Sequence, residues 1–146
     1  MMPDAELNPA AVEIGSFFPQ LPDAVWRALT EPDVHGRWLM PSTGFEPSVG
    51  THFILTAPKG EIACEVLTVR PIERLTFSWI DLRARHPARW VVDWTVRRQG
   101  RGTRLLLTQT GFDLEDRRQQ MARHAMERGW RVLLARLREE LDRTEA

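Results

Sequence analysis

Residues 121–141, with the sequence MARHAMERGWRVLLARLREEL, decide the fold that this chain is predicted to adopt. Apolar side chains recur in this stretch at spacings of four, four, three, four and four residues, which aligns them on one side of an α-helix. Arginine and glutamate occupy the other sides. Because glycine is unfavourable inside a helix, we expect Gly129 to mark a close approach of the helix backbone to a sheet. The apolar positions are Ala122, Met126, Trp130, Leu133, Leu137 and Leu141.

Five strand-like segments precede this helix, and each is bounded by proline or glycine turns. One further strand and two short helices come before them. Short connections between consecutive strands favour antiparallel hairpins over parallel crossovers. The predicted fold class is therefore α+β, with a six-stranded antiparallel sheet and the order β-α-α-β-β-β-β-β-α. The predicted strands are 11–18, 51–57, 61–69, 74–79, 89–98 and 103–110, and the short helices are 21–29 and 30–36.

The composition is that of an ordinary globular protein, with 42% hydrophobic residues, 27% charged residues and a formal net charge of zero. This charge gives no electrostatic reason to expect nucleic acid or an anionic membrane as a partner. No apolar run approaches the roughly 20 residues that span a bilayer, and the N-terminus lacks the layout of a signal peptide. We therefore expect a cytoplasmic protein without membrane insertion.

The chain has no internal repeat, low-complexity linker or break in composition. We predict one domain over residues 11–143, preceded by a disordered segment at residues 1–10. Cys64 is the only cysteine, which excludes a disulfide within one chain and a zinc site built from cysteines.

The glycine turn at 100–102 predicts a tight hairpin whose inner face is apolar up to its far end. The cross-strand pairs would be Val92 with Gln109, Trp94 with Leu107, and Val96 with Leu105. The chain has six tryptophans and no tyrosine. These rings either fill the core or line a cavity, because a single helix rarely fills the concave side of a curved sheet.

Trp38, Trp79 and Trp90 are the better cavity candidates since they lie at a loop or at strand ends, whereas Trp94 is predicted to be core. In such a cavity the amide of Gln109 would orient a ligand by hydrogen bonds. The candidate ligand-binding residues are Trp38, Phe53, Trp79, Trp90, Gln109, Met126 and Trp130.

The polar residues form no recognisable catalytic, metal-binding or phosphate-binding motif, so we predict no catalytic residue, no metal and no cofactor. Two side chains stay ambiguous. Glu65 is a buried carboxylate if its own face of the strand is the inner one, but solvated if Cys64 and Val66 face inward. His124 lies beside the apolar stripe and is either solvated or directed at a cavity.

The other three histidines are read from their positions along the chain. His35 is expected near the end of the second helix, where a positive charge is mildly favourable. His52 alternates away from Phe53, and His86 lies in the loop before Pro87, so we expect both at the surface.

An ordered series of motifs runs along residues 11–142 and resembles the heat-shock-protein-90 ATPase activator homologue family, within the START-like (SRPBCC) superfamily. The opening motif is LPDAVWRALTEP at residues 21–32, followed by Trp38 and Pro41. The other matches are Gly50 with Phe53, Glu73-Arg74-Leu75 with Trp79, Gly102-Thr103-Arg104-Leu105, Thr110-Gly111-Phe112, and Gly129-Trp130 with Leu134 and Leu137.

The resemblance implies a helix-grip fold, in which a curved antiparallel sheet wraps around the C-terminal helix and leaves a hydrophobic cavity. Co-chaperone activity in the family belongs to eukaryotic proteins with an additional N-terminal domain, which we do not expect here. No strict catalytic motif transfers to this chain.

Our leading prediction is a protein that binds a small hydrophobic, lipid-like or aromatic ligand between the sheet and the C-terminal helix. One alternative is an enzyme similar to polyketide cyclases or isomerases, with His124 or Glu65 as its acid–base group. A second alternative is a chaperone-binding interaction module. Exposed strand edges also leave room for a homodimer.

Overall fold

The structure, a computed structural model, describes residues 9–145. Residues 1–8, within the segment predicted to be disordered, lie outside the described residues. The strands are β1 (Val12–Phe18), β2 (Ser42–Thr43), β3 (His52–Ala57), β4 (Gly60–Arg70), β5 (Arg74–Asp81), β6 (Arg89–Gln99) and β7 (Gly102–Thr110). The helices are α2 (Pro22–Thr30), α3 (Pro32–Trp38) and α4 (Arg117–Glu145).

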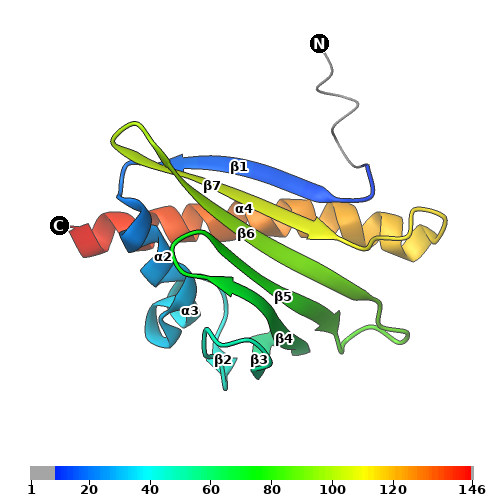
Figure 1. The fold of residues 1–146 in the computed structure, drawn as a ribbon. Helices are drawn as coiled ribbons and strands as arrows, with labels where there is room; N and C mark the ends of the chain where they lie inside the picture. Colours follow the sequence, from blue (N-terminus) through cyan, green and yellow to red (C-terminus); the bar gives the residue numbers. More distant parts are fainter. Residues whose placement is uncertain (1–8, 146) are drawn as a thin grey trace, which may run out of the picture.

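The strands form one antiparallel sheet of seven strands, in the order β1-β7-β6-β5-β4-β3-β2, and α4 runs along one face of it (Figure 1). The predicted α+β helix-grip architecture is confirmed, but the predicted count of six strands is too low by one. The additional strand is β2, whose Ser42 and Thr43 pair with Leu55 and Ile54 of β3. Two residues are too few to show an alternating pattern, so nothing local in the sequence marks this strand.

The pairing of the strands fixes which side chains face α4. Val92 of β6 lies opposite Gln109 of β7, as predicted from the glycine turn. In the neighbouring ladder Trp79 of β5 lies opposite Trp90 of β6. Directly opposed residues in a sheet point to the same side, so these side chains share the inner face. The first strand also pairs with the last, from Val12 opposite Gln109 onward.

The predicted apolar stripe of α4 is confirmed except that Leu134 is buried and the predicted Leu133 only partly so, and its second half anchors the helix. Trp130, Leu134, Leu137 and Leu141 are all buried against the sheet and the short helices. Between residues 117 and 129 no described side chain is fully buried, and Met126 is only partly buried. The first turns of α4 therefore cover the sheet more loosely than the rest of the helix.

The expectation for Gly129 is wrong. No atom lies within 4 Å of the position that a Cβ at this residue would take, and the glycine faces solvent. It sits one residue before the buried Trp130, on a side of the helix turned away from the sheet. No close approach of backbones requires a glycine at this position.

The two short helices lie beside the C-terminal end of α4 (Figure 1). Each begins with a proline in its first turn followed by an aspartate, Asp23 or Asp33, which suits the start of a helix. α3 continues past the predicted end at Gly36 to Trp38. This extension lets the indole N–H of Trp38 donate a 2.7 Å hydrogen bond to the carbonyl oxygen of Ala28, which joins α3 to α2.

Four indole rings form a continuous row through the core. The ring centroids of Trp38 and Trp94 lie 5.8 Å apart, those of Trp94 and Trp130 lie 5.5 Å apart, and those of Trp130 and Trp79 lie 5.5 Å apart. Each of these side chains is at most 1% exposed. Trp94 is thus part of the core as predicted, and indole rings occupy the middle of the space between the sheet and α4.

Candidate functional site

A pocket lies where the loop between β5 and β6 faces the first turns of α4, with a volume of about 240 Å³. Its walls come from three segments: the end of β5 with the following loop, the start of β6, and the start of α4. We call it the Trp90 pocket. Its lining residues are Asp81, Ala84, Arg85, His86, Ala88, Trp90, Asp116, Arg118, Gln119 and Ala122.

Trp90 is the largest apolar side chain among the lining residues, and its ring is held on two sides. One side stacks on Phe112 with 4.5 Å between ring centroids. The indole N–H donates to Oε1 of Gln119 at 3.4 Å, and the same oxygen accepts the backbone N–H of Asp113 at 2.9 Å. These contacts connect β6 to the loop before α4 and hold the ring in position, so the pocket is preformed.

The two carboxylates of the Trp90 pocket are bound within the protein. Asp81 accepts hydrogen bonds of 2.9 and 2.8 Å from the guanidinium of Arg83, and these bonds hold the pKa of Asp81 below its ordinary value. Asp116 accepts the backbone N–H of Arg118 at 2.9 Å, at the start of α4. Both carboxylates are therefore hydrogen-bonded within the protein.

Beside the Trp90 pocket, a polar group of side chains lies in the interior. The indole N–H of Trp130 donates a 2.7 Å hydrogen bond to Oε1 of Gln109. The amide nitrogen of Gln109 and the indole nitrogen of Trp79 are buried, and neither has a hydrogen-bond partner among the described residues. Trp79 stands opposite Trp90 in the sheet and Gln109 stands opposite Val92, so both side chains share the inner face with Trp90, although neither lines the pocket.

The structure divides the predicted ligand-binding residues into two groups. Trp79, Trp90, Gln109 and Trp130 come together as described above. Phe53 is 2% exposed and packs edge-on against Phe77 of β5, with 5.4 Å between ring centroids. Trp38 also lies in the core, and Met126 packs against the core from α4. Neither Trp38 nor Met126 lines the Trp90 pocket.

The two ambiguous polar residues lie outside the interior. Cys64 and Val66 are buried, whereas the side chain of Glu65 is 40% exposed and lies 3.5 Å from His52. Glu65 therefore faces away from α4. His124 is exposed on α4, where it lines a shallow surface pocket near the N-terminal end of the described chain.

Of the other three histidines, one departs from its predicted position. His52 and His86 are exposed as predicted, but His35 is only 1% exposed. Its ring stacks on Phe45 with 4.3 Å between centroids, and burial lowers the pKa of His35 to about 4. The expectation of a favourable positive charge is wrong, because Phe45 and Phe53 lie over the ring from outside the helix.

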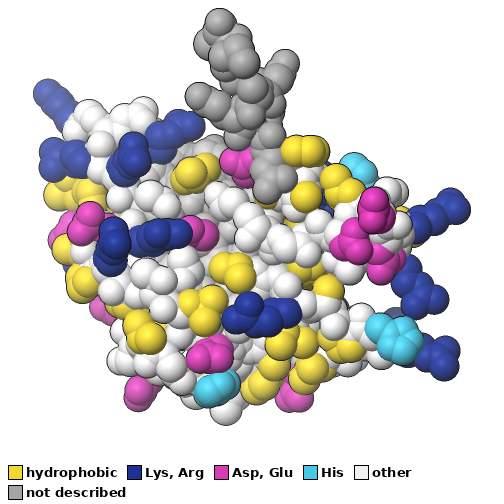
Figure 2. All heavy atoms as spheres, turned by 45° about the vertical axis from the view of Figure 1, so that its right-hand side comes forward, with side chains coloured by type: hydrophobic (Ala, Val, Ile, Leu, Met, Phe, Trp, Pro, Cys, Tyr) yellow, Lys and Arg dark blue, Asp and Glu magenta, His cyan; other side chains and the backbone are white. Residues whose placement is uncertain are grey.

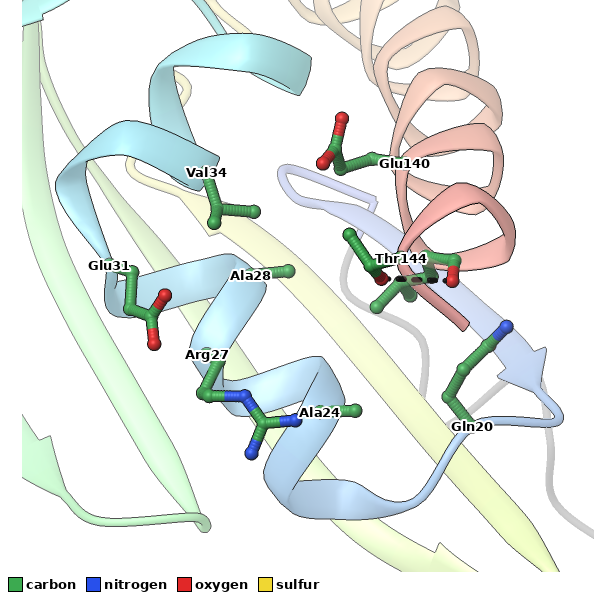
Figure 3. Close-up of a pocket in the computed structure, with 9 residues that line it drawn as sticks. Gln20, Ala24, Arg27, Ala28, Glu31, Val34, Glu140 and Thr144 are labelled. Atoms are coloured by element: carbon green, nitrogen blue, oxygen red, sulfur yellow. Dashed lines mark hydrogen bonds between the residues drawn. The ribbon is translucent and has the colours of Figure 1, made fainter. Parts of the chain in front are cut away.

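A second pocket, of about 170 Å³, lies between α2, α3 and the C-terminal end of α4 (Figure 3). Ala24, Ala28 and Val34 line it on the side of the short helices, and Glu140 approaches from α4 (Figure 3). The carboxylate of Glu140 is already paired with Arg37 of α3 at 3.0 Å. This pocket is therefore a gap between helices whose buried charge is already compensated.

The structure also bears on metals and membranes. Within residues 9–145, no group of three or more His, Cys, Asp and Glu side chains is arranged to hold a metal ion. None of the described helices is long and apolar enough to cross a bilayer.

Several residues of the Trp90 pocket have no counterpart in the sequence prediction, among them Arg85, Arg118 and Gln119. They lie in a loop and at a helix start, which carry no periodic pattern. Their only sequence signal is the Pro87 loop, which marks a turn but not the segment that it faces.

The comparisons with known proteins agree with this architecture. The chain matches the family described as "Activator of Hsp90 ATPase homolog 1-like protein" over residues 21–142. No curated protein matches it. Protein MLL2253 from Mesorhizobium loti, whose crystal structure is solved, is 34% identical with a TM-score of 0.83, and the match covers 92% of this chain and 98% of that one.

Two more distant structures show the fold alone. CalU16 from Micromonospora echinospora is 24% identical with a TM-score of 0.75, and the match covers 90% of this chain and 75% of that one. The Aha1 dimer from Colwellia psychrerythraea, solved in solution, is 17% identical with a TM-score of 0.73, covering 90% and 95%. On the family match and the relative from Mesorhizobium loti, the chain belongs to the Activator of Hsp90 ATPase homolog 1-like family.

Proposed function

We propose that this protein binds a small, largely apolar ligand in the Trp90 pocket. The observation that carries the proposal is a pocket lined by Trp90, whose cross-strand neighbour Trp79 has a buried, unpaired N–H group, as does Gln109 on the same inner face. Buried polar groups in folded proteins nearly always have hydrogen-bond partners, and an unpaired donor is costly. A ligand that places a carbonyl or hydroxyl oxygen against these donors would remove that cost.

The packing of α4 supports a route for such a ligand. Its side chains are buried from Trp130 onward, while Ala122 and Met126 in the preceding turns are only partly buried. A small outward movement of these first turns would join the Trp90 pocket to the donors on Trp79 and Gln109 without disturbing the anchored half of the helix.

The size of the pocket sets the size of the ligand. A volume of about 240 Å³ exceeds the roughly 150 Å³ of an apolar cavity that accepts benzene. One or two fused rings would therefore fit. Full burial of an aromatic group contributes about 1.5–3 kcal/mol, so two such groups with one or two hydrogen bonds sum to about 4–9 kcal/mol, which corresponds to affinities from the millimolar to the micromolar range.

A thermal-shift screen with small aromatic and lipid-like compounds tests the proposal, and we expect some of them to raise the melting temperature. The variant Ala122→Phe would fill the pocket from α4 and should abolish that rise. Ala125→Phe, the same change at an exposed position of the same helix, is the matched control and should keep it. Wild-type protein that responds to no apolar compound would contradict the proposal, as would equal ligand responses of the two variants.

The enzyme alternative receives less support from the geometry. Neither of its candidate groups, Glu65 and His124, lines the Trp90 pocket, and both carboxylates that do line it are bound within the protein. His86 also lines the pocket, but it is exposed and no hydrogen bond to a described residue orients its ring. Binding without chemistry is the simpler function for this pocket.

A homodimer forms a second part of the proposal. Phe17 and Leu106 are exposed on the outer face of the sheet, at 44% and 38%, on the neighbouring strands β1 and β7. Leu106 stands opposite Gly15, which has no side chain to cover it. We expect light scattering to give the mass of a dimer, and Phe17→Asp with Leu106→Asp to give that of a monomer. A wild-type monomer at high protein concentration would contradict this part.

A further inference from the structure

The Trp90 pocket has cationic groups that the protein itself leaves unpaired. Its two carboxylates, Asp81 and Asp116, are bound to Arg83 and to the backbone of α4. The guanidinium groups of Arg85 and Arg118 also line the pocket, and neither forms a hydrogen bond or ion pair with another described residue. Both cations therefore retain their donors for a partner from outside the protein.

A histidine also lines the pocket. His86 lines the pocket next in sequence to Arg85 and is exposed. Figure 2 shows basic side chains in dark blue and a histidine in cyan projecting from the right-hand side of the molecule, beside a group of acidic side chains. Asp113 and Glu115 of the loop before α4 do not line the pocket.

The start of α4 adds positive charge beside the pocket. Its first turn contains no acidic residue and opens with Arg117 and Arg118. The N-terminal end of a helix carries partial positive charge, so arginine is unfavourable there. Asp116, directly before the helix, accepts the backbone N–H of Arg118 at 2.9 Å and offsets only part of this charge. Departures from local preference of this kind are found at functional sites more often than elsewhere in a fold.

We propose that the ligand of the Trp90 pocket is an aromatic acid, whose carboxylate is bound by Arg85 and Arg118 while its ring lies against Trp90. This inference rests on the proposed function and names the class of ligand. The planar guanidinium of arginine presents paired donors that match the two oxygens of a carboxylate. The ring would lie on the apolar part of the pocket formed by Trp90 and Ala122.

The two ends of the site then have separate tasks. The apolar floor provides affinity for any flat ring of suitable size, and the arginines at the rim select the charged compound over a neutral one. Because Arg85 and Arg118 are both exposed, their contribution should weaken as salt screens the charge.

Calorimetric titration with 1-naphthoate and its uncharged analogue 1-naphthamide separates these tasks. We expect naphthoate to bind at least tenfold more tightly than naphthamide in 50 mM salt, and the difference to shrink in 500 mM salt. Arg85→Gln and Arg118→Gln should each weaken naphthoate about tenfold and leave naphthamide unchanged. Arg101→Gln, in the β6–β7 turn outside the pocket lining, is the matched control and should change neither.

The outcomes distinguish this inference from the proposed function. Equal binding of both probes, with neither arginine variant altering the ratio, would overturn the assignment of an acid while leaving an apolar-ligand pocket intact. If neither probe binds and the thermal-shift screen is also negative, the proposed function fails and this inference fails with it. Since the substituted arginines are exposed, the variants should fold, and their melting temperatures verify this.

Discussion

The indole N–H of Trp130 donates a 2.7 Å hydrogen bond to Oε1 of Gln109, joining the middle of α4 to the inner face of β7. Both side chains are fully buried. Gln109→Leu keeps a similar volume but leaves the indole N–H of Trp130 without an acceptor. We expect the free energy of unfolding, measured by urea denaturation, to fall by about 1–3 kcal/mol.

A double-mutant cycle separates this hydrogen bond from changes in packing. Trp130→Phe also removes the donor, so the double variant with Gln109→Leu has no unpaired group at this contact. We expect it to be less destabilised than the sum of the two single variants. Strict additivity would show that the hydrogen bond contributes nothing to stability.

His35 should make the protein sensitive to mild acid. Its pKa is lowered by burial from 6.5 to about 4 in the native state, so between these values the unfolded chain binds a proton that the native protein does not. Stability is thus fully present above pH 6.5 and is lost as the pH falls towards 4, by roughly 3 kcal/mol. His35→Phe should reduce this loss in urea denaturation across that range.

The control for this prediction is His124→Gln, which removes an exposed histidine. It should show the same loss of stability as the wild type, because it retains His35. Carboxylates elsewhere contribute equally to every variant and do not affect the comparison. Identical pH profiles for His35→Phe and the wild type would show that the buried ring does not couple protonation to folding.

The ion pair between Arg37 and Glu140 should hold α3 on α4. The Glu140 side chain is only 4% exposed and receives Arg37 at 3.0 Å, while Arg143 lies farther away at 3.5 Å. Arg37→Met leaves this buried carboxylate with the weaker partner alone. We expect a loss of about 1–3 kcal/mol in the free energy of unfolding, since Arg37 is half exposed and its charge is partly screened.

An exposed ion pair provides the comparison. Arg27 and Asp23 lie 3.4 Å apart on α2, and both side chains are more than half exposed. Arg27→Met should change the free energy of unfolding by less than about 0.5 kcal/mol. If both arginine variants lose the same amount in chemical denaturation, burial of Glu140 has no energetic consequence.

Gly129→Ala should stabilise the protein. Nothing lies near the position of the new methyl group, and alanine restricts the unfolded chain more than glycine does. We expect the free energy of unfolding to rise by about 0.5–1 kcal/mol, seen as a higher melting temperature. Gly102→Ala is the contrasting variant, because its methyl group would collide with the carbonyl oxygen of Phe18, and it should lower the melting temperature.

The sequence was sufficient to predict those elements whose signals are local. The hairpin of β6 and β7 follows from its glycine turn, because that turn alone determines that Trp94 meets Leu107. The stripe from Ala122 to Leu141 required only the period of a helix. These features depend on neighbouring residues and not on the rest of the fold.

Features that depend on distant segments could not be predicted. Strand β2 exists only because β3 lies beside it, and the burial of His35 depends on Phe45 and Phe53, which follow it in the chain. For Glu65 the alternation allowed either face, and only the assembled sheet decides between them. The Trp90 pocket was missed for the same reason, since its two walls lie in the loop after β5 and at the start of α4.

The pairing of β1 with β7 determines when the sheet can be completed. Val12 finds its partner in Gln109, so β1 leaves the ribosome long before β7 and stays unpaired until β7 has been synthesised. Contacts between residues so far apart in the sequence make folding slow, and until β7 is present the unpaired edge of β1 is exposed to other chains. Crowded synthesis at high expression should therefore favour aggregation, and a chaperone that shields nascent strands should relieve it.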